Sequence, residues 1–75
     1  MNYLINIIWD NEYKVWIATS DDIPGLVLES DSYDVLINKI KYAIPELFEL
    51  NNIQNNKINL IFITNRQEDI LQMQF

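Results

Sequence analysis

The 75-residue sequence has no cysteine and no histidine, and it contains a single glycine. Without cysteine there is no disulfide, no thiol nucleophile and no thiolate zinc site, and without histidine the commonest general base is missing. One glycine cannot build a glycine-rich phosphate loop. These absences argue against most catalytic chemistry, so we expect a protein that is not an enzyme and that holds no metal and no cofactor.

Basic residues are also scarce. The chain has 5 Lys and Arg residues against 11 Asp and Glu residues, which gives a formal net charge of -6 and a pI of about 4.2. Proteins that bind nucleic acid need clustered positive charge, so we expect no direct contact with nucleic acid. An acidic surface favours a basic protein partner, while the plainer interpretation is that the charge only keeps the protein soluble.

Long apolar runs are absent as well. No stretch approaches the roughly 20 apolar residues of a membrane span, and no basic segment precedes an apolar signal sequence, so we expect a cytoplasmic protein with no membrane contact. A chain of this length forms one small domain with a small core, which we place at residues 1–64, followed by a C-terminal tail at 65–75. Because no disulfide stabilises so small a core, we expect self-association into a homodimer or larger homo-oligomer.

Large apolar residues recur with a period of two in residues 3–9, and residues 14–20 form the return strand, which predicts two paired β-strands. A two-residue hairpin loop at Asn11-Glu12 would place Trp16 opposite Ile7. One face would then be strongly apolar, with Tyr3, Ile5, Ile7, Trp9, Trp16 and Ala18. The other face would be half apolar, with Leu4, Ile8, Val15 and Ile17. A solvated sheet face is normally more polar than this, so we expect another chain to cover part of it; the alternative is scattered surface apolar residues.

An acidic corner, Asp21-Asp22-Ile23-Pro24-Gly25, separates the second strand from a third at residues 26–29. Proline presets φ for the first central position of a type II turn, and glycine accepts the positive φ of the second. The sequence therefore predicts two strands joined by a rigid turn. This corner could be a mere connection or a surface that presents charge.

A helix and a last strand complete the pattern. Ser32 is the candidate N-cap of an amphipathic helix that begins at Tyr33, and Pro45 is expected to kink this helix or start a second segment. Residues 58–64 predict a fourth strand, whose outer neighbour we expect to be the same strand of a second molecule. The predicted fold class is α+β, an antiparallel sheet with element order β-β-β-α-β and one amphipathic helix packed on one face.

Carboxylates at strand ends are the remaining candidates for catalytic chemistry. Asp10, Asp21, Asp22 and Glu29 lie at such ends and could converge on Mg²⁺. Adjacent Asp21 and Asp22 would point apart on a strand, however, and loop carboxylates are usually solvated. We therefore expect no metal site.

These motifs, taken together, resemble the short single-domain branch of the HicB-like antitoxin family. The resemblance is carried by Trp9-Asp10, by Val15-Trp16-Ile17-Ala18, by the corner from Ser20 to Leu26, and by Ser32 before an amphipathic helix. It implies a degraded ribonuclease H-like fold, homo-oligomers, and an antitoxin that masks a small basic HicA-like toxin that cleaves mRNA. Many members also carry a C-terminal DNA-binding domain, for which residues 65–75 are too short.

The predicted site residues follow from this interpretation. We expect the corner residues Asp21, Asp22, Ile23 and Pro24 to contact the partner, Asp10 and Glu12 of the hairpin to add charge, and Gly25 to act as a structural turn residue together with Pro24. One alternative is a homo-oligomeric scaffold or small-ligand module without a toxin partner. Another is a residual Mg²⁺-dependent nuclease of ribonuclease H type that uses Asp10.

Overall fold

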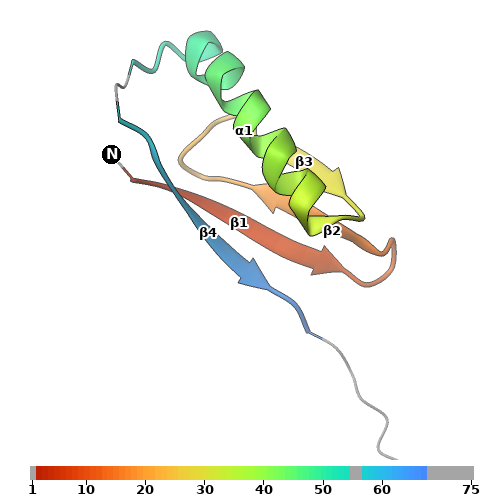
Figure 1. The fold of residues 1–75 in the computed structure, drawn as a ribbon. Coiled ribbons are helices and arrows are strands. Elements are labelled where there is room, and N and C mark those ends of the chain that lie inside the picture. The colour runs from red at the N-terminus through yellow and green to blue at the C-terminus, as the bar shows by residue number, and fades with distance from the viewer. Residues whose placement is uncertain (1, 55–56, 68–75) are drawn as a thin grey trace, which may run out of the picture.

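The computed structural model describes residues 2–54 and 57–67. The elements in chain order are β1 (Asn2–Asp10), β2 (Val15–Thr19), β3 (Val27–Ser30), α1 (Tyr33–Leu50) and β4 (Asn59–Asn65). The strands form one sheet in the order β3-β2-β1-β4, and α1 packs on one face of it (Figure 1). The predicted α+β class and the order β-β-β-α-β are confirmed. Most of the predicted tail, residues 68–75, lies outside the described residues.

The sheet is mixed, which corrects the expectation of an antiparallel sheet. β1 pairs antiparallel with β2, and β2 pairs antiparallel with β3, but β4 runs parallel to β1 with Tyr3 opposite Leu60. The chain leaves the end of β1, passes through β2, β3 and α1, and returns beside the start of β1. A crossover that contains a helix is what parallel neighbours require, whereas a hairpin can join only antiparallel strands.

The hairpin between β1 and β2 is longer than predicted. Its loop has four residues, Asn11–Lys14, and Lys14 adopts a positive φ of 57°. Asp10 Oδ1 accepts hydrogen bonds from the backbone N–H groups of Glu12 (2.9 Å) and Tyr13 (3.1 Å), which stabilise this wider turn. The register therefore moves by two residues. Because a shift of two keeps every side chain on its predicted face, the assignment of faces is unchanged.

The type II turn at Pro24-Gly25 is confirmed. Gly25 has a φ of 87°, and the N–H of Leu26 donates to the carbonyl oxygen of Ile23 at 3.2 Å. A Cβ atom at Gly25 would lie 3.2 Å from Cδ2 of Leu47 on α1. The glycine is therefore required by its backbone conformation and also by close packing against the helix.

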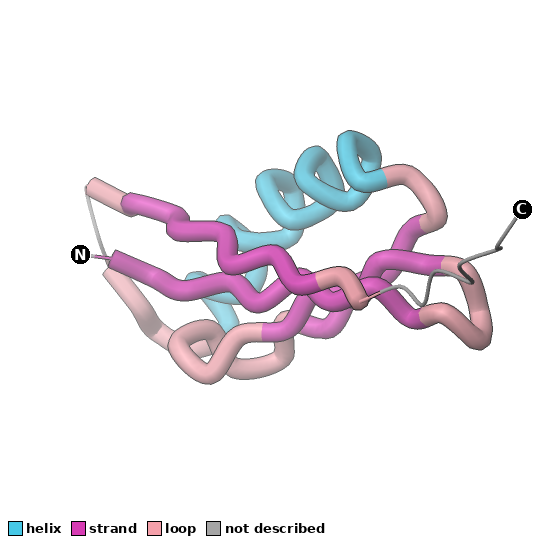
Figure 2. Tube along the Cα trace, turned by 90° about the horizontal axis from the view of Figure 1, so that it is seen from below, coloured by secondary structure: helices cyan, strands magenta, loops and turns pink. Residues whose placement is uncertain are grey.

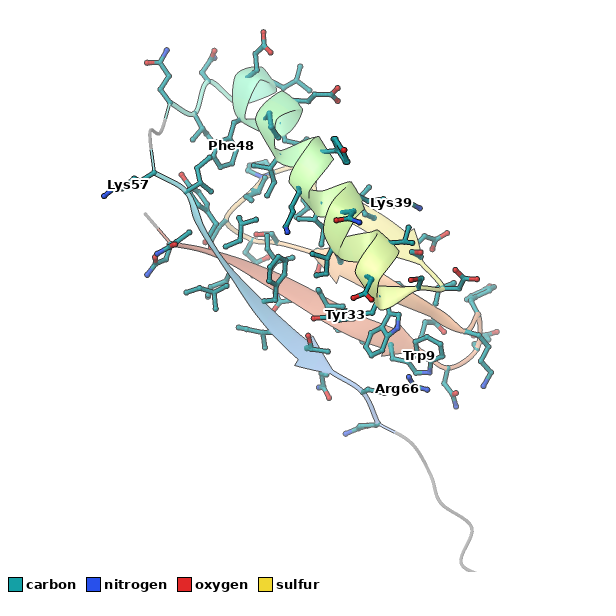
Figure 3. The ribbon with its side chains drawn as sticks, viewed as in Figure 1. Trp9, Tyr33, Lys39, Phe48, Lys57 and Arg66 are labelled. Atoms are coloured by element: carbon teal, nitrogen blue, oxygen red, sulfur yellow. The ribbon has the colours of Figure 1, made fainter. Side chains whose placement is uncertain are left out.

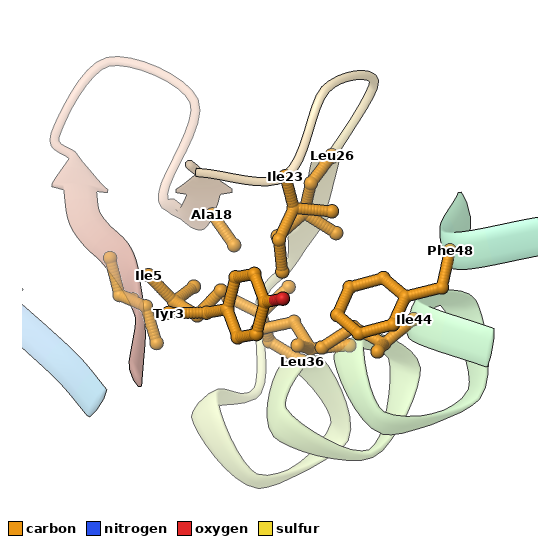
Figure 4. Close-up of a cluster of buried hydrophobic side chains, with 10 residues drawn as sticks. Tyr3, Ile5, Ala18, Ile23, Leu26, Leu36, Ile44 and Phe48 are labelled. Carbon is orange, nitrogen blue, oxygen red and sulfur yellow. The ribbon is translucent and has the colours of Figure 1, made fainter. Parts of the chain in front are cut away.

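The core lies between α1 and the sheet face that was predicted to be apolar. Ser32 caps the helix by accepting from the N–H of Val35 at 3.3 Å, as predicted. The rings of Tyr3 and Phe48 contact each other with centroids 5.1 Å apart (Figure 4). The buried apolar residues are Tyr3, Ile5, Ile7, Ala18, Ile23, Leu26, Leu36, Ile40, Ile44 and Phe48.

Pro45 lies inside α1, which continues as one element to Leu50. Of the two alternatives predicted for Pro45, a kink or the start of a second segment, the second is therefore wrong. Proline removes only one N–H donor, and its helical neighbours Ile44 and Phe48 are buried in the core. Their burial stabilises the helix on both sides of the missing hydrogen bond. At its end, Asn51 Nδ2 donates to the carbonyl oxygens of Leu47 (2.8 Å) and Pro24 (3.1 Å), which ties the helix to the corner.

Candidate binding surface

No helix, strand or loop of the described residues covers the sheet face opposite α1 (Figure 2). We call this surface the open face. The strand registers place seven aliphatic side chains on it: Leu4, Ile8, Val15, Ile17, Val27, Ile61 and Ile63. Their exposed fractions reach 53% for Ile8 and 71% for Val27. Asn6 and Thr19, which pair with each other, lie among these aliphatic side chains on the same face. A largely aliphatic exposed surface on a small protein is typical of an interaction site.

The charged strand residues on the open face are both negative. None of the four strands contains Lys or Arg. The alternation of the strands places Asp10 of β1 and Glu29 of β3 on this face, because Ile8 and Val27 lie there two residues away. The open face therefore combines aliphatic side chains with acidic charge, which suits a partner surface that is apolar and basic.

The predicted hairpin residues divide into two roles. Asp10 uses Oδ1 to hold the turn through the N–H groups of Glu12 and Tyr13, so part of its function is structural. The side chain of Glu12 is exposed at the tip of the hairpin. Glu12 is thus placed where it can meet a partner without any change in the fold.

The two adjacent aspartates of the corner are also different from each other. Asp22 Oδ2 accepts from the N–H of Leu4 at 2.7 Å, and Ser20 Oγ donates to the carbonyl oxygen of Leu4 at 2.6 Å. These side chains continue the hydrogen bonding of β1 beyond the end of β2. Asp21 is exposed and carries the outward charge of the corner.

The remaining corner residues have structural positions. Ile23 is fully buried with an exposed fraction of 0%, so we reassign it from the predicted partner contacts to the core. Pro24 is exposed, and its carbonyl oxygen accepts from Asn51. Gly25 keeps the structural role that the sequence predicted for it.

The corner and the hairpin do not come together. Leu4, which is bonded to the corner, and Asp10, the last residue before the hairpin loop, lie six residues apart on β1. At about 3.4 Å per residue the two acidic groups are separated by roughly 20 Å. They lie at opposite ends of the β1–β2 pair, with the open face between them.

An aromatic cluster lies on the other side of the sheet, near the start of α1 (Figure 3). The rings of Trp9 and Trp16 meet edge to face at 5.1 Å, and Tyr33 contacts Trp16 at 5.2 Å. The Arg66 guanidinium lies 4.2 Å from the ring centre of Trp9. Tyr33 Oη also hydrogen-bonds Thr64 Oγ1 at 2.8 Å. This cluster joins β4 to the helix start, and no pattern in the sequence indicated the contribution of Arg66.

A hollow of about 300 Å³ lies beside this cluster, lined by Ile8, Trp9, Asn11, Asn65 and Gln67. Its polar lining consists of amides and contains no charged side chain. Within the described residues, Trp9 Nε1 is a buried donor that has no hydrogen-bond partner. None of the residues that line the hollow could act as an acid, a base or a nucleophile.

Two further classes of site are missing from residues 2–54 and 57–67. No three carboxylates gather closely enough there to hold a metal ion, so Asp10, Asp21, Asp22 and Glu29 do not converge in the way that the Mg²⁺ alternative requires. In the same part of the chain, no helix has both the length and the apolar character needed to cross a membrane.

Comparison with known proteins assigns the family. The model of a family described as a domain of unknown function (DUF1902) matches residues 2–73. The chain belongs to the DUF1902 family. A hypothetical protein, TTHA1013, from the extremely thermophilic bacterium Thermus thermophilus has a similar crystal structure, with a TM-score of 0.81 and 31% sequence identity over 93% of this chain and 100% of that chain. No curated protein matches the chain.

For this DUF1902 protein, the sequence indicated only part of the open face. The alternation of β1 and β2 placed Leu4 and Ile8 on a second apolar face, but Val27, Ile61 and Ile63 were not assigned to it. The residues from Leu60 to Ile63 form a continuous apolar run, which predicts a strand but does not show which residues lie on which face. What was missing was the register with β1, because strand pairing across a long crossover has no local signal.

Proposed function

We propose that this DUF1902 protein is a non-enzymatic, cytoplasmic binding module of antitoxin type, whose open face masks a small basic HicA-like toxin that cleaves mRNA. The observation that carries the proposal is the open face itself, with seven aliphatic side chains and only acidic charge. The resemblance of the Trp9-Asp10 turn and the Asp21-Asp22 corner to HicB-like antitoxins supports the choice of partner.

The open face supplies two properties that binding of such a partner requires, which are affinity and fast encounter. Desolvation of aliphatic side chains supplies affinity, at about 25 cal/mol for each Å² of apolar surface removed from water. Asp10 and Glu29 on the face, with Glu12 and Asp21 at its two ends, attract positive charge and speed encounter. A partner that covers the face in this way would lose access to its own RNA-binding surface.

Co-expression with the small basic protein encoded beside this chain, where there is one, tests the proposal. We expect the two proteins to co-purify and the RNA cleavage by the partner to stop on titration with this chain. Ile8→Lys, on the open face of the inner strand β1, should weaken the complex strongly because it places a cation in an apolar contact with a basic partner.

Tyr42→Lys is the matched control. Tyr42 is exposed at 82% on α1, away from the open face, so the same new charge there should leave the complex intact. Equal binding by the Ile8→Lys and Tyr42→Lys variants would contradict the assignment of the open face. Absence of any complex with the unchanged chain would instead favour the scaffold alternative.

A further inference from the structure

The two edges of the sheet are protected to different degrees. β3 is short, with four residues, and Glu29 within it is charged. β4 is longer, with seven residues, and it contains no charged residue and no proline. Natural proteins usually shield such an edge, because its unpaired backbone groups are a template for another strand. In this chain no described element covers the outer edge of β4.

The hydrogen bonds of β1 determine which backbone groups of β4 point to the outer edge of the sheet. Leu4 directs its N–H to Asp22 and its carbonyl oxygen to Ser20, on the β2 side. Alternate residues of a strand point to opposite sides, so Ile5 directs its backbone groups to β4. In a parallel ladder these groups bond to the two residues that flank the paired residue.

Since Ile5 pairs with Phe62, its bonds go to Ile61 and Ile63. The intervening residues Leu60, Phe62 and Thr64 therefore turn their N–H and carbonyl groups to the outer edge. These three residues have side chains on the helix side of the sheet, while Ile61 and Ile63 have theirs on the open face. The outer edge is thus a regular row of donors and acceptors.

We propose that the outer edge of β4 pairs antiparallel with β4 of a second copy of this chain, about a two-fold axis at Phe62. Phe62 is the central residue of β4. In this register Leu60 faces Thr64 of the partner subunit, and all three outward residues face outward residues. The two residues of each such pair exchange two backbone hydrogen bonds. The outward N–H and carbonyl groups of β4 therefore find partners in the second copy without any change in the strand.

The side chains fit the same register on both faces. On the open face, Ile61 meets Ile63 of the partner subunit in the closer, non-hydrogen-bonded type of pair, with Cα atoms about 4.5 Å apart. Neither Lys57 nor Arg66 meets a cation, since Lys57 falls opposite Gln67 of the partner subunit and Arg66 opposite Ile58 of the partner subunit. A second copy is therefore favoured by the sequence of β4 itself. The open faces of the two subunits become one continuous surface.

The inference does not depend on the proposed toxin partner, and its test can be separated from that of the proposed function. Thr64→Pro removes an outward N–H at an edge position, where proline is tolerated by a single subunit. Thr64→Val also removes the hydroxyl that bonds Tyr33, but it keeps the backbone N–H. We expect sedimentation equilibrium to give twice the chain mass of 8.9 kDa for the unchanged protein and for Thr64→Val, and 8.9 kDa for Thr64→Pro.

Ile8→Lys distinguishes edge pairing from association through the open faces. It should keep the dimer while it weakens the toxin complex, so the two proposals fail independently. A monomeric unchanged protein would overturn the inference. So would a Thr64→Pro variant that remains dimeric, or a dimer that Ile8→Lys dissociates.

Amide hydrogen exchange on the unchanged protein supplies a second measurement that does not require any variant to fold. We expect the Phe62 N–H to be protected at high protein concentration and to lose protection on dilution, whereas the Ile63 N–H should stay protected by β1. Rapid, concentration-independent exchange at Phe62 would overturn the inference, because an N–H in an inter-subunit ladder cannot exchange freely.

Discussion

The two faces of the sheet have similar side chains and very different surroundings. On β1, Ile5 points to the face under α1 and is 0% exposed, whereas Ile8 points to the open face and is 53% exposed. The helix lies over β2 and β3 (Figure 1), so it can bury only one face. The face that the sequence predicted to be the more apolar is the one that α1 covers, and the other face stays exposed although it is rich in aliphatic side chains. The apolar surface left over is the observation on which the proposed function rests.

The largest expected effect comes from substituting the same residue type on each face of β1. Ile5→Ala removes fully buried methyl groups and leaves a cavity, so it should lower the free energy of unfolding by about 2–5 kcal/mol. Ile8→Ala should lower it by less than about 1 kcal/mol, because its side chain is already half in water. Urea denaturation of both variants measures the difference. Equal losses would mean that the open face is as well packed as the covered one.

The corner allows the same comparison between adjacent aspartates. Asp22→Ala should cost about 1.5–2 kcal/mol, the low end for a hydrogen bond to a charged group, because the bond from the Leu4 N–H is exposed and water can replace part of it. Asp21→Ala should change stability by no more than about 0.5 kcal/mol, since Asp21 is exposed. Thermal unfolding of the two variants distinguishes a structural from a surface carboxylate. A larger loss for Asp21→Ala would reverse the roles that we assign to the pair.

A smaller effect is expected at the Pro24-Gly25 turn, which packs against α1. Gly25→Ala should cost about 1–2 kcal/mol, because alanine is strained at a φ of 87° and its Cβ would crowd Leu47. Pro24→Ala keeps the turn geometry and serves as the control. Urea denaturation at equilibrium provides the measurement, and a Gly25→Ala variant as stable as the unchanged chain would contradict the positive-φ requirement.

Local pattern was sufficient for the elements and for the two faces. The alternation of β1 and β2 predicted which residues are buried, Ser32 was predicted as the helix cap, and Pro24-Gly25 was predicted as a type II turn. Each of these depends on neighbours in sequence. The hairpin register was wrong by two residues, because Asp10 and Lys14 stabilise a longer loop than Asn11-Glu12 suggested.

The candidate site was predicted less completely than the fold. The sequence marked Asp21 and Asp22 alike, and only the hydrogen bond to Leu4 separates them. It placed Ile23 at the surface with its acidic neighbours, although the corner turns this side chain into the core. A loop residue has no periodicity that reveals its direction, so such assignments require the three-dimensional path of the chain.

The pattern of residues along the chain was enough to establish a small acidic α+β protein with one capped helix, a rigid corner, and strands that are apolar on both faces. It took the folded arrangement to establish that β4 lies parallel to β1, that α1 covers one face and leaves the other open, and that Arg66 contacts Trp9. The physical reason is the range of the interactions. Propensity, capping and turn chemistry act within a few residues, whereas strand pairing and helix packing join residues that are distant in the chain.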